Sequence, residues 1–210
     1  MGRPPIVDRE IALERIMFQF WRTGFHPTSL DDLLAASGMH RGSFYRTFGD
    51  KRTAFDAAFA LYVQRVAATD VLPALTSTAS PMTRLETLLI ARVEAALGNA
   101  GPTAGARPGC LVTNTATELA AHDERAGEQV GAALNGVRDS IAMLLRAGAE
   151  AGEVDPAVDA DAAADHLFAV LQGAIVMSRS GQSAERLHQL IRSAIAVVAP
   201  SPGPNPGESP

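Results

Sequence analysis

Residues 28–48 combine signals for two short helices with a glycine turn between them, and they constrain the fold of this 210-residue chain more than any other segment. Ser29 can accept a hydrogen bond from the backbone near Asp32, as an N-cap residue does, so a helix is expected to begin there. Three leucines follow at positions 30, 33 and 34, the spacing of one apolar helix face. Gly38 then stands where a left-handed residue would end the helix. The segment therefore predicts a helix-turn-helix.

The second helix of this pair carries an apolar anchor and a polar, cationic face. Phe44 and Phe48 recur four residues apart and can point into the core together. The side chains between them point largely elsewhere, and a cationic second helix is typical of a helix-turn-helix that reads DNA. The polar side chains expected to face DNA are Arg41, Ser43, Tyr45 and Arg46.

Two residues here break local rules of helix stability. Gly42 lies in the first turn of the second helix, where it costs up to about 1 kcal/mol relative to alanine but lets the backbone approach a groove closely. It could also merely start the helix. Lys51, the only lysine in the chain, follows the expected N-cap Asp50 and so places a cation at the positive end of a helix. A bound phosphate would reverse that unfavourable sign, and the alternative is a solvated surface charge.

The composition predicts an all-α protein. Apolar residues make up 47% of the chain and aromatic residues only 5%, alanine is abundant, and no sustained alternation of apolar and polar residues indicates a strand. Residues 1–70 carry a net charge of +1 and residues 71–210 a net charge of −6, which gives the −5 of the whole chain. So small an excess of cations supports local contact with phosphates rather than a broad basic patch.

Proline and glycine residues divide the chain. An amphipathic helix over about 8–23 is expected to cover the helix-turn-helix, and a connecting helix over 51–70 to lead out of it, with Pro73 ending or kinking that region. We expect a helix-turn-helix domain over 1–50, a larger helical domain over 51–199 and a disordered tail over 200–210. Further helices are expected near 81–97, 110–121, 123–150, 157–179 and 184–198, with a flexible segment at 98–109.

Targeting and membrane signals are missing from the sequence. The N-terminus has no apolar signal region, and no stretch approaches the roughly 18 uncharged apolar residues of a membrane span, so a soluble cytoplasmic protein is expected. The lone Cys110 excludes an intrachain disulfide framework. Its thiol is either a sensor of oxidants or electrophiles or a packed group. A reactive thiol needs a nearby cation, only Arg107 is close in sequence, and packing is therefore favoured.

Catalytic and metal-binding motifs are also missing. The glycine-rich segment 98–109 lacks the Gly-Lys-Ser/Thr ending of a phosphate-binding loop, and no Gly-x-Ser-x-Gly appears. The five histidines have no cysteine or histidine partner at metal spacing, and Asp161, Asp165 and His166 are better explained as a solvated helix face. We expect neither an enzyme nor a bound cofactor or metal.

The first sixty residues resemble the TetR family of transcriptional regulators. The resemblance rests on Gly2-Arg3-Pro4, on Phe20-x-x-x-Gly24-Phe25-x-x-Thr28-Ser29-Leu30 and on Gly42-Ser43-Phe44-Tyr45-x-x-Phe48-x-Asp50-Lys51. It implies phosphate contacts from Thr28, Tyr45 and Lys51, and a basic arm that includes Arg3. His40 departs from the family, which usually places Ser, Thr or Asn at that cap. The residues expected to contact DNA are Arg3, Thr28, Ser29, Arg41, Gly42, Ser43, Tyr45, Arg46 and Lys51.

The larger region resembles one branch of the same regulators, through Gly109-Cys110-Leu111-Val112-x-Asn114 and Glu118-Leu119-Ala120. This resemblance implies a small-molecule pocket among the helices and a dimer formed by the last two long helices. The residues proposed for the pocket are Phe59, Tyr62, Arg92, Asn114 and Gln172. The apolar faces proposed for the dimer, which could instead fill the monomer core, contain Leu167, Leu171, Ile175, Leu187, Leu190, Ile191 and Ile195.

Together these features predict a homodimeric repressor that binds a palindromic operator in double-stranded DNA and is released by a small-molecule effector. Release would follow from a shift of the connecting helix that changes the spacing of the two recognition helices. The alternative is a helical small-molecule-binding protein whose DNA binding is weak or lost.

Overall fold

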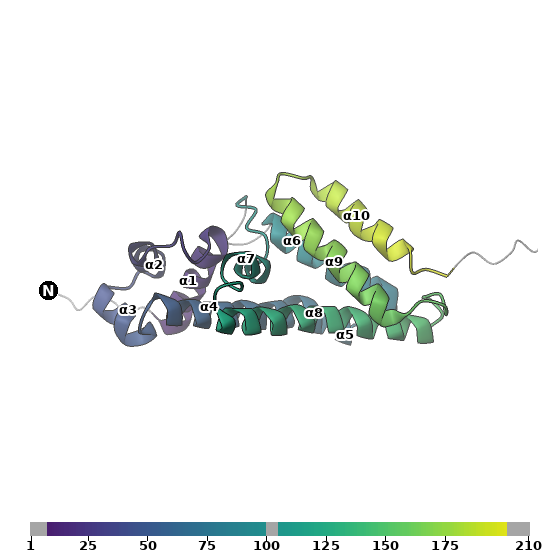
Figure 1. Cartoon of the computed structure of the whole chain (residues 1–210), viewed down its shortest axis with the longest axis horizontal. Coiled ribbons are helices and arrows are strands. Elements are labelled where there is room, and N and C mark those ends of the chain that lie inside the picture. The colour runs from purple at the N-terminus through teal and green to yellow at the C-terminus, as the bar shows by residue number, and fades with distance from the viewer. Residues whose placement is uncertain (1–7, 100–104, 201–210) are drawn as a thin grey trace, which may run out of the picture.

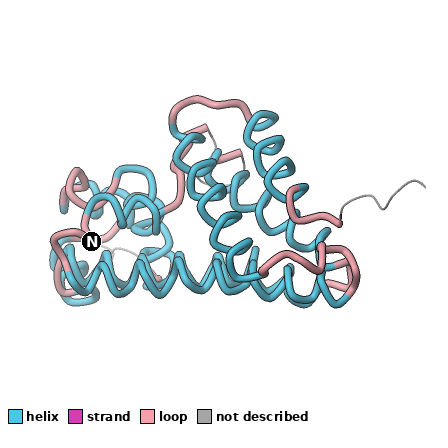
Figure 2. Tube along the Cα trace, turned by 45° about the vertical axis from the view of Figure 1, so that its right-hand side comes forward, coloured by secondary structure: helices cyan, strands magenta, loops and turns pink. Residues whose placement is uncertain are grey.

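The structure, a computed structural model, describes residues 8–99 and 105–200, and every regular element within those ranges is a helix (Figure 2). The prediction of an all-α fold is confirmed. The elements in chain order are α1 (Arg9–Thr23), α2 (Leu30–Ser37), α3 (Arg41–Phe48), α4 (Lys51–Val66), the π-helical turn η1 (Ala67–Val71), α5 (Leu72–Thr76), α6 (Pro81–Leu97), α7 (Leu111–Glu118), α8 (Glu124–Glu150), α9 (Ala160–Arg179) and α10 (Ala184–Ala196).

Helices α1 to α3 form one end of the elongated molecule (Figure 1). Asp8 caps α1 by accepting a hydrogen bond from the backbone of Glu10, and one face of α1 packs on α2 and α4. Phe20 of α1 meets Phe55 of α4 edge to face, with ring centroids 5.1 Å apart. This aromatic contact fixes the helix-turn-helix against the helix that leads out of it.

The connecting helix is longer than the sequence predicted. Instead of ending before Pro73, the helical path widens into η1 and continues as α5 to Thr76. Pro73 is the second residue of α5, directly after η1, and this wider turn accommodates a residue that has no backbone N–H.

The larger part of the molecule is a bundle in which α6, α8, α9 and α10 pack together, with α7 between this bundle and the helix-turn-helix (Figure 1). Several predicted bounds shift by a few residues because capping decides them. Asp159 caps α9 through the backbone N–H groups of Asp161 and Ala162, so this helix begins at Ala160 rather than 157. Helix α7 is confined to 111–118, whereas residues 110–121 were predicted.

Helix α9 is long and apolar enough, by length and composition alone, to cross a membrane. The sequence does not predict this, because Asp161, Asp165 and Arg179 leave an uncharged stretch shorter than a membrane span. The structure packs α9 against α6, α8 and α10, and Asp161 and Asp165 near its start form ion pairs with Arg138 of α8. These contacts are those of a bundle helix. Only 28% of the apolar window of α9 is buried within the single chain.

Candidate functional site

Helix α2 and the turn after it are held by side-chain and backbone caps. The Ser29 hydroxyl accepts a hydrogen bond from the backbone N–H of Asp32, whose carboxylate accepts one from the Ser29 backbone, a reciprocal capping box. The side-chain and backbone hydrogen bonds from Ser29 lower the pKa of Asp32 below its usual value. Gly38 ends the helix in the left-handed conformation, with φ of 72°. The orientation of α3 is thereby set by local interactions.

Helix α3 buries one face and exposes the other. Phe44 and Phe48 are buried and in contact, with ring centroids 5.4 Å apart. The opposite face is open to solvent, and Tyr45 on it is 46% exposed, unusually high for a large aromatic side chain. His40 makes no side-chain capping hydrogen bond at the start of α3. The exposed residues of this face are Arg41, Gly42, Tyr45 and Arg46, with Ser43 half-buried beside them.

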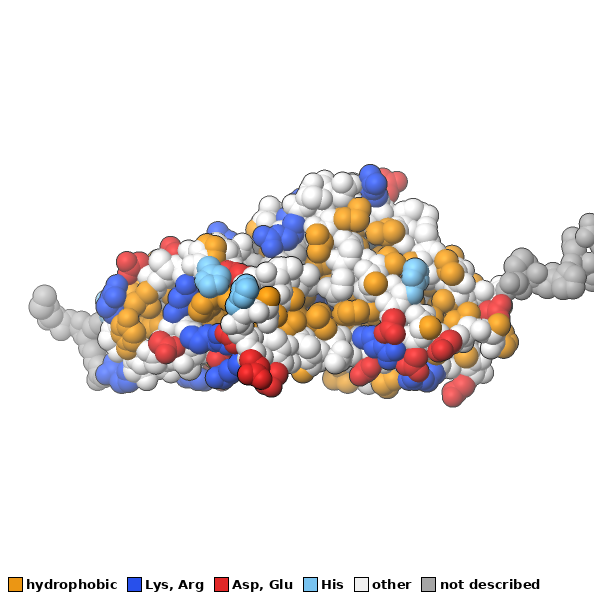
Figure 3. Space-filling model, in the orientation of Figure 1, with side chains coloured by type: hydrophobic (Ala, Val, Ile, Leu, Met, Phe, Trp, Pro, Cys, Tyr) orange, Lys and Arg blue, Asp and Glu red, His pale blue; other side chains and the backbone are white. Residues whose placement is uncertain are grey.

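The polar groups of this face have only weak or exchangeable partners. Arg41 pairs with Asp31 of α2 at 2.7 Å, but both side chains are more than half exposed, so water or a phosphate could replace the contact. Arg46 donates to the Ser43 hydroxyl at 3.3 Å. A Cβ atom built on Gly42 would meet nothing within 4 Å, so the backbone there is free to approach another molecule. In Figure 3, Lys and Arg side chains lie around this end of the molecule, interspersed with acidic ones.

Two residues of the predicted DNA-binding set serve the fold instead. The Thr28 side chain is 1% exposed, and its hydroxyl lies 2.6 Å from both the Gly24 carbonyl oxygen and the Thr23 hydroxyl. In this conformation the Thr28 hydroxyl is therefore engaged within the chain, and its phosphate contact stays a prediction. Ser29 is exposed, but its hydroxyl donates to Asp32 while capping α2. Arg3 lies outside the described residues.

Lys51 is not a freely solvated surface charge. Its ammonium nitrogen lies 4.4 Å from the centroid of the Phe25 ring and 3.4 Å from the carbonyl oxygen of His26. Asp50 caps the same helix by accepting a hydrogen bond from the Thr53 backbone at 2.7 Å. The cation is thus held beside the N-terminus of α4 and the turn that precedes α2.

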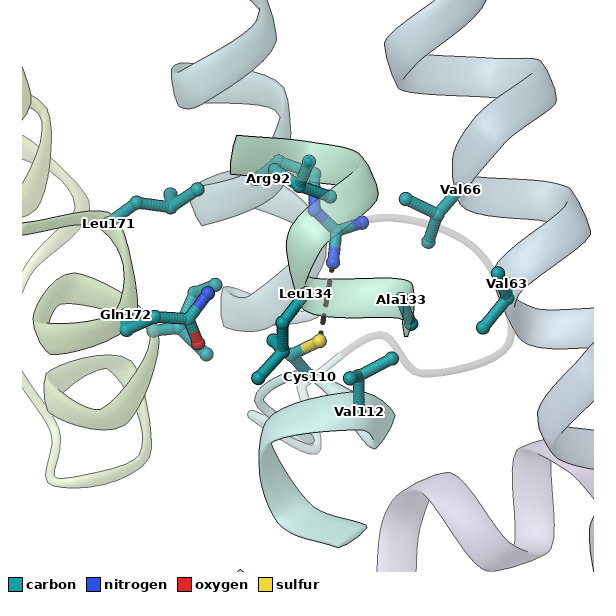
Figure 4. A pocket seen from close by; sticks show the side chains of 11 residues that line it. Val63, Val66, Arg92, Cys110, Val112, Ala133, Leu134, Leu171 and Gln172 are labelled. Carbon is teal, nitrogen blue, oxygen red and sulfur yellow. Dashed lines mark hydrogen bonds between the residues drawn. The ribbon is translucent and has the colours of Figure 1, made fainter. Parts of the chain in front are cut away.

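A pocket with about 370 Å³ of empty space, counted out to its mouth, lies among α4, α6, α7, α8 and α9 (Figure 4). The space inside it that is closed off from open solvent is only about 30 Å³, far below the roughly 300–1,000 Å³ of typical small-molecule sites, so an effector would have to widen the pocket. Two of the five predicted pocket residues, Arg92 and Gln172, form part of its wall. Aliphatic side chains that were not predicted form most of the remaining lining: Val63, Val66, Val112, Ala133, Leu134, Val137, Leu171 and Ile175.

The other predicted pocket residues lie elsewhere. Phe59 is buried against Phe55 in the aromatic cluster of α4. Asn114 bonds the Pro108 carbonyl oxygen and the guanidinium of Arg179. Neither residue lines the pocket, because local contacts hold both side chains away from it. Tyr62 is not part of the lining, although its hydroxyl contacts two residues that are.

The two lining residues that the Tyr62 hydroxyl contacts are Cys110, through its thiol, and Arg92, which is 4% exposed. An Arg92 Nη2 nitrogen lies 3.3 Å from Cys110 Sγ (Figure 4) and 3.4 Å from the Tyr62 hydroxyl. Its Nη1 nitrogen pairs with Asp70 of η1 at 2.9 Å. Arg107, the only cation close to the thiol in sequence, instead bonds the carbonyl oxygens of Ser178 and Gln182.

The predicted dimer residues mostly fill the core of the single chain. The side chains of five of them pack α9 and α10 against each other and against α6, so in this conformation these five fill the core of the single chain, and the predicted interface stays a prediction for the other two. Leu190 and Ile195 are half-buried. The fully buried residues are Leu167, Leu171, Ile175, Leu187 and Ile191.

A contact that the sequence did not reveal joins the larger domain to the helix-turn-helix. The Glu118 carboxylate at the end of α7 accepts hydrogen bonds from the backbone N–H groups of Phe25, at 2.9 Å, and His26, at 2.6 Å. At the other end of α7, the indole N–H of Trp21 donates to the Gly109 carbonyl oxygen at 2.9 Å. Helix α7 therefore connects the pocket wall at Cys110 with the turn that leads into α2.

Two family models match the chain. "Bacterial regulatory proteins, tetR family" matches residues 13–62, and "Tetracyclin repressor-like, C-terminal domain" matches residues 81–194. The HTH-type transcriptional repressor ComR of Escherichia coli (strain K12) is 28% identical over 189 residues, which cover 90% of this chain and 88% of ComR. The HTH-type transcriptional repressor DhaR of Mycobacterium sp. (strain GP1) is 25% identical over 206 residues, 96% of either chain.

Solved structures share the fold. A TetR transcriptional regulator from Chloroflexus aurantiacus J-10-FL has a TM-score of 0.79 at 25% identity and covers 92% of this chain and 96% of its own. The TetR family transcriptional regulator CifR, solved as a cysteine mutant in complex with 26-bp double-strand operator DNA, also has a TM-score of 0.79 at 25% identity, with coverage of 94% and 100%.

Proposed function

The chain belongs to the TetR family of bacterial transcriptional regulators, and we propose that it works as a homodimer that leaves its operator when a small effector fills the pocket. It is a non-enzymatic helix-turn-helix repressor that binds operator DNA. We infer that residues 1–50 form the DNA-binding domain and residues 51–199 the effector and dimerisation domain, with α4 as the connection. A soluble regulator of this kind would work in the cytoplasm, where its operator DNA is.

The observation that carries the proposal is the two-sided character of α3. Phe44 and Phe48 anchor the helix, so its exposed face is presented without unfolding cost to a major groove. On this face Arg46 would read a base edge, while Tyr45 and the neighbouring Lys51 would contact phosphates. Ser29 and Thr28 would act by positioning α2 rather than by binding DNA themselves.

The proposed dimer uses the exposed faces of α9 and α10. The low burial of the apolar window of α9 leaves one long side of that helix uncovered within the single chain, and Val176 on it is 56% exposed. A second copy related by a two-fold axis would cover this side and complete a four-helix interface. The exposed residues spaced along α9 are Ala162, Ala169, Gly173 and Val176.

The proposed effector is a small and mostly apolar molecule that binds among α4 and α6 to α9. Two recognition helices must lie about 34–36 Å apart to enter successive major grooves on one face of B-DNA. An effector that binds better to a conformation with another spacing shifts the population away from the operator-bound state, whereas equal affinity for both conformations would shift nothing.

Selection of genomic DNA fragments by the purified protein, followed by anisotropy titration of the selected fragment, tests this function. We expect a palindromic fragment that binds as a dimer and binds much more tightly than a scrambled sequence at two salt concentrations. Equal affinity for the selected and scrambled DNA would overturn operator recognition and favour a protein that binds only small molecules.

A further inference from the structure

The corner between α7 and α8 holds two separate elements of the DNA-binding end. Helix α7 ends at Glu118, and Asp123 follows as the N-cap of α8. The Glu118 carboxylate binds the turn before α2 through the backbone N–H groups of Phe25 and His26. The Asp123 carboxylate binds the start of α4, because each of its two oxygens accepts a hydrogen bond from the Arg52 guanidinium. One short segment of the chain therefore holds both ends of the helix-turn-helix.

The forked contact between Arg52 and Asp123 resists movement of α4 against α8. A guanidinium that donates two hydrogen bonds to one carboxylate fixes the angle between the two groups as well as their distance. Both side chains are half-buried, so water competes only in part for the contact. Arg52 also donates to Asp56 at 3.0 Å, and Arg125 of α8 pairs with the other oxygen of Asp56 at 3.2 Å. Two carboxylates thus join α4 to the start of α8.

A further contact between α4 and the turn closes a ring of polar contacts. The ammonium nitrogen of Lys51, the neighbour of Arg52, lies 3.4 Å from the carbonyl oxygen of His26, while the N–H of His26 is bound by Glu118. The turn before α2, the start of α4 and the corner between α7 and α8 therefore each contact the other two. The segment that carries α2 and α3 begins at this turn and ends at α4, so the ring fixes the recognition helix relative to the rest of the molecule.

From this ring we propose that Glu118 and Asp123 are positioning residues, which set the separation of the two recognition helices in the dimer and so the half-site spacing of the operator. The inference rests on the proposed homodimer, because such a separation exists only between two copies of the chain. Both residues act through other groups, Glu118 through the backbone of the turn and Asp123 through Arg52. Phosphates repel carboxylates, so neither residue is expected to touch DNA itself.

Operator spacing is a sensitive measure of this separation. Neighbouring base pairs of B-DNA are about 3.4 Å apart along the helix axis. One base pair added to or removed from the operator centre therefore moves one half-site by that distance and also turns it about the axis. A DNA-binding end that is held by both carboxylates cannot follow this change without breaking charged contacts, whereas a loosened one can. Loss of a positioning contact should thus lower the preference for one spacing, in addition to any loss of affinity.

The test compares the selected operator with two versions that keep both half-sites but have one base pair inserted or deleted at the centre. Anisotropy titration of the full-length protein gives the three affinities. We expect the parent protein to bind the selected spacing at least about tenfold more tightly than either altered spacing. Glu118→Gln and Asp123→Asn should each reduce this ratio by about threefold or more. The slope of log affinity against log salt concentration should stay the same, because no phosphate contact is removed.

Both variants keep the shape of the side chain. Glu118→Gln retains one acceptor oxygen but replaces the other with an amide group that cannot accept a backbone N–H. Asp123→Asn removes the charge opposite Arg52 but retains an oxygen that can cap α8, since asparagine caps helices as well as aspartate does. The matched controls are Asp159→Asn, at the N-cap of α9, and Glu128→Gln, at an exposed position of α8. Both controls should keep the spacing preference of the parent protein.

A second measurement does not depend on DNA. Spin labels on Ala35→Cys, at an exposed position of α2, measure the distance between the two DNA-binding ends of the free dimer. The protein without this substitution shows how much label reaches the buried Cys110. The distribution of the distance should be broader in Glu118→Gln and in Asp123→Asn than in the parent protein and the two controls.

The positioning role is overturned if the parent protein has no spacing preference, if both variants keep that preference, or if the distance distribution does not broaden. Equal losses of affinity at all three spacings would leave the preference unchanged and would mean that the two contacts only stabilise the fold. Circular dichroism checks that each variant is folded, and if one is not, the other decides. Failure of the parent protein to dimerise or to bind any palindromic fragment would instead overturn the proposed function.

Discussion

The Glu118 carboxylate lies 2.6 Å from the backbone nitrogen of His26, although 92 positions separate the two residues in sequence. A second oxygen of the same carboxylate accepts the N–H of Phe25. One side chain of α7 thus satisfies two backbone donors of the turn that precedes α2. These two hydrogen bonds hold the end of α7 against the helix-turn-helix.

Replacement of Glu118 by alanine should lower the free energy of unfolding by about 1–3 kcal/mol, because two N–H groups lose a charged acceptor. Urea denaturation measures the change. The matched control is Glu128→Ala, which removes an exposed carboxylate of α8 and should stay within about 0.5 kcal/mol of the parent protein. If both variants unfold at the same urea concentration as the parent, the Glu118 contact contributes nothing to stability.

Gly24→Ala should destabilise the protein more than an ordinary surface change. Gly24 has φ of +88°, and a Cβ atom there would lie 2.8 Å from a carboxylate oxygen of Glu118. We expect a loss of more than about 1 kcal/mol in unfolding free energy. Gly136→Ala is the control: its Cβ meets nothing within 4 Å in the middle of α8, so it should stabilise by up to about 1 kcal/mol. Changes of the same sign in both variants would contradict this explanation.

Lys51→Ala should weaken binding to operator and random DNA alike. The loss of one phosphate contact should lower the slope of log affinity against log salt concentration by about 1. Lys51→Arg keeps the charge over Phe25 and should preserve most of the slope. Anisotropy titrations at several salt concentrations measure both variants. A slope unchanged by the alanine substitution would mean that Lys51 does not meet a phosphate.

Arg46→Ala should change base preference rather than affinity for all DNA. Its side chain is exposed on α3, and among residues 8–99 and 105–200 its one hydrogen-bond partner is the Ser43 hydroxyl, so it is free to reach a base edge. Loss of such a contact should cost about 1–3 kcal/mol at one operator position. Titration against single-base operator variants locates that position. Equal losses on operator and random DNA would make Arg46 a phosphate contact instead.

Val176→Asp should convert the dimer to a monomer, because it places a charge on the exposed apolar side of α9. Leu72→Asp is the control, since Leu72 on α5 is also 56% exposed but lies outside the proposed interface. Analytical ultracentrifugation should find a monomer for the first variant and a dimer for the second. A dimer in both would place the interface elsewhere.

Local sequence signals were enough to predict the structure of the DNA-binding end. Ser29 and Gly38 marked the limits of α2, and the spacing of Phe44 and Phe48 gave the buried face of α3. These signals act within a few residues of one another, so caps and helical periodicity reveal them without any tertiary information. The all-helical class followed for the same reason.

The side chains that meet between helices could be identified only from the packed fold. Arg92 approaches Cys110 across 18 positions and Glu118 approaches His26 across 92, whereas Arg107, the sequence neighbour of the thiol, bonds elsewhere. The apolar stripe that contains Leu171 has the same sequence pattern whether it packs in the chain's own core or against a second subunit, and here Leu171 is buried in the core. Periodicity gives the face of a helix, but the packing of the other helices decides what covers that face.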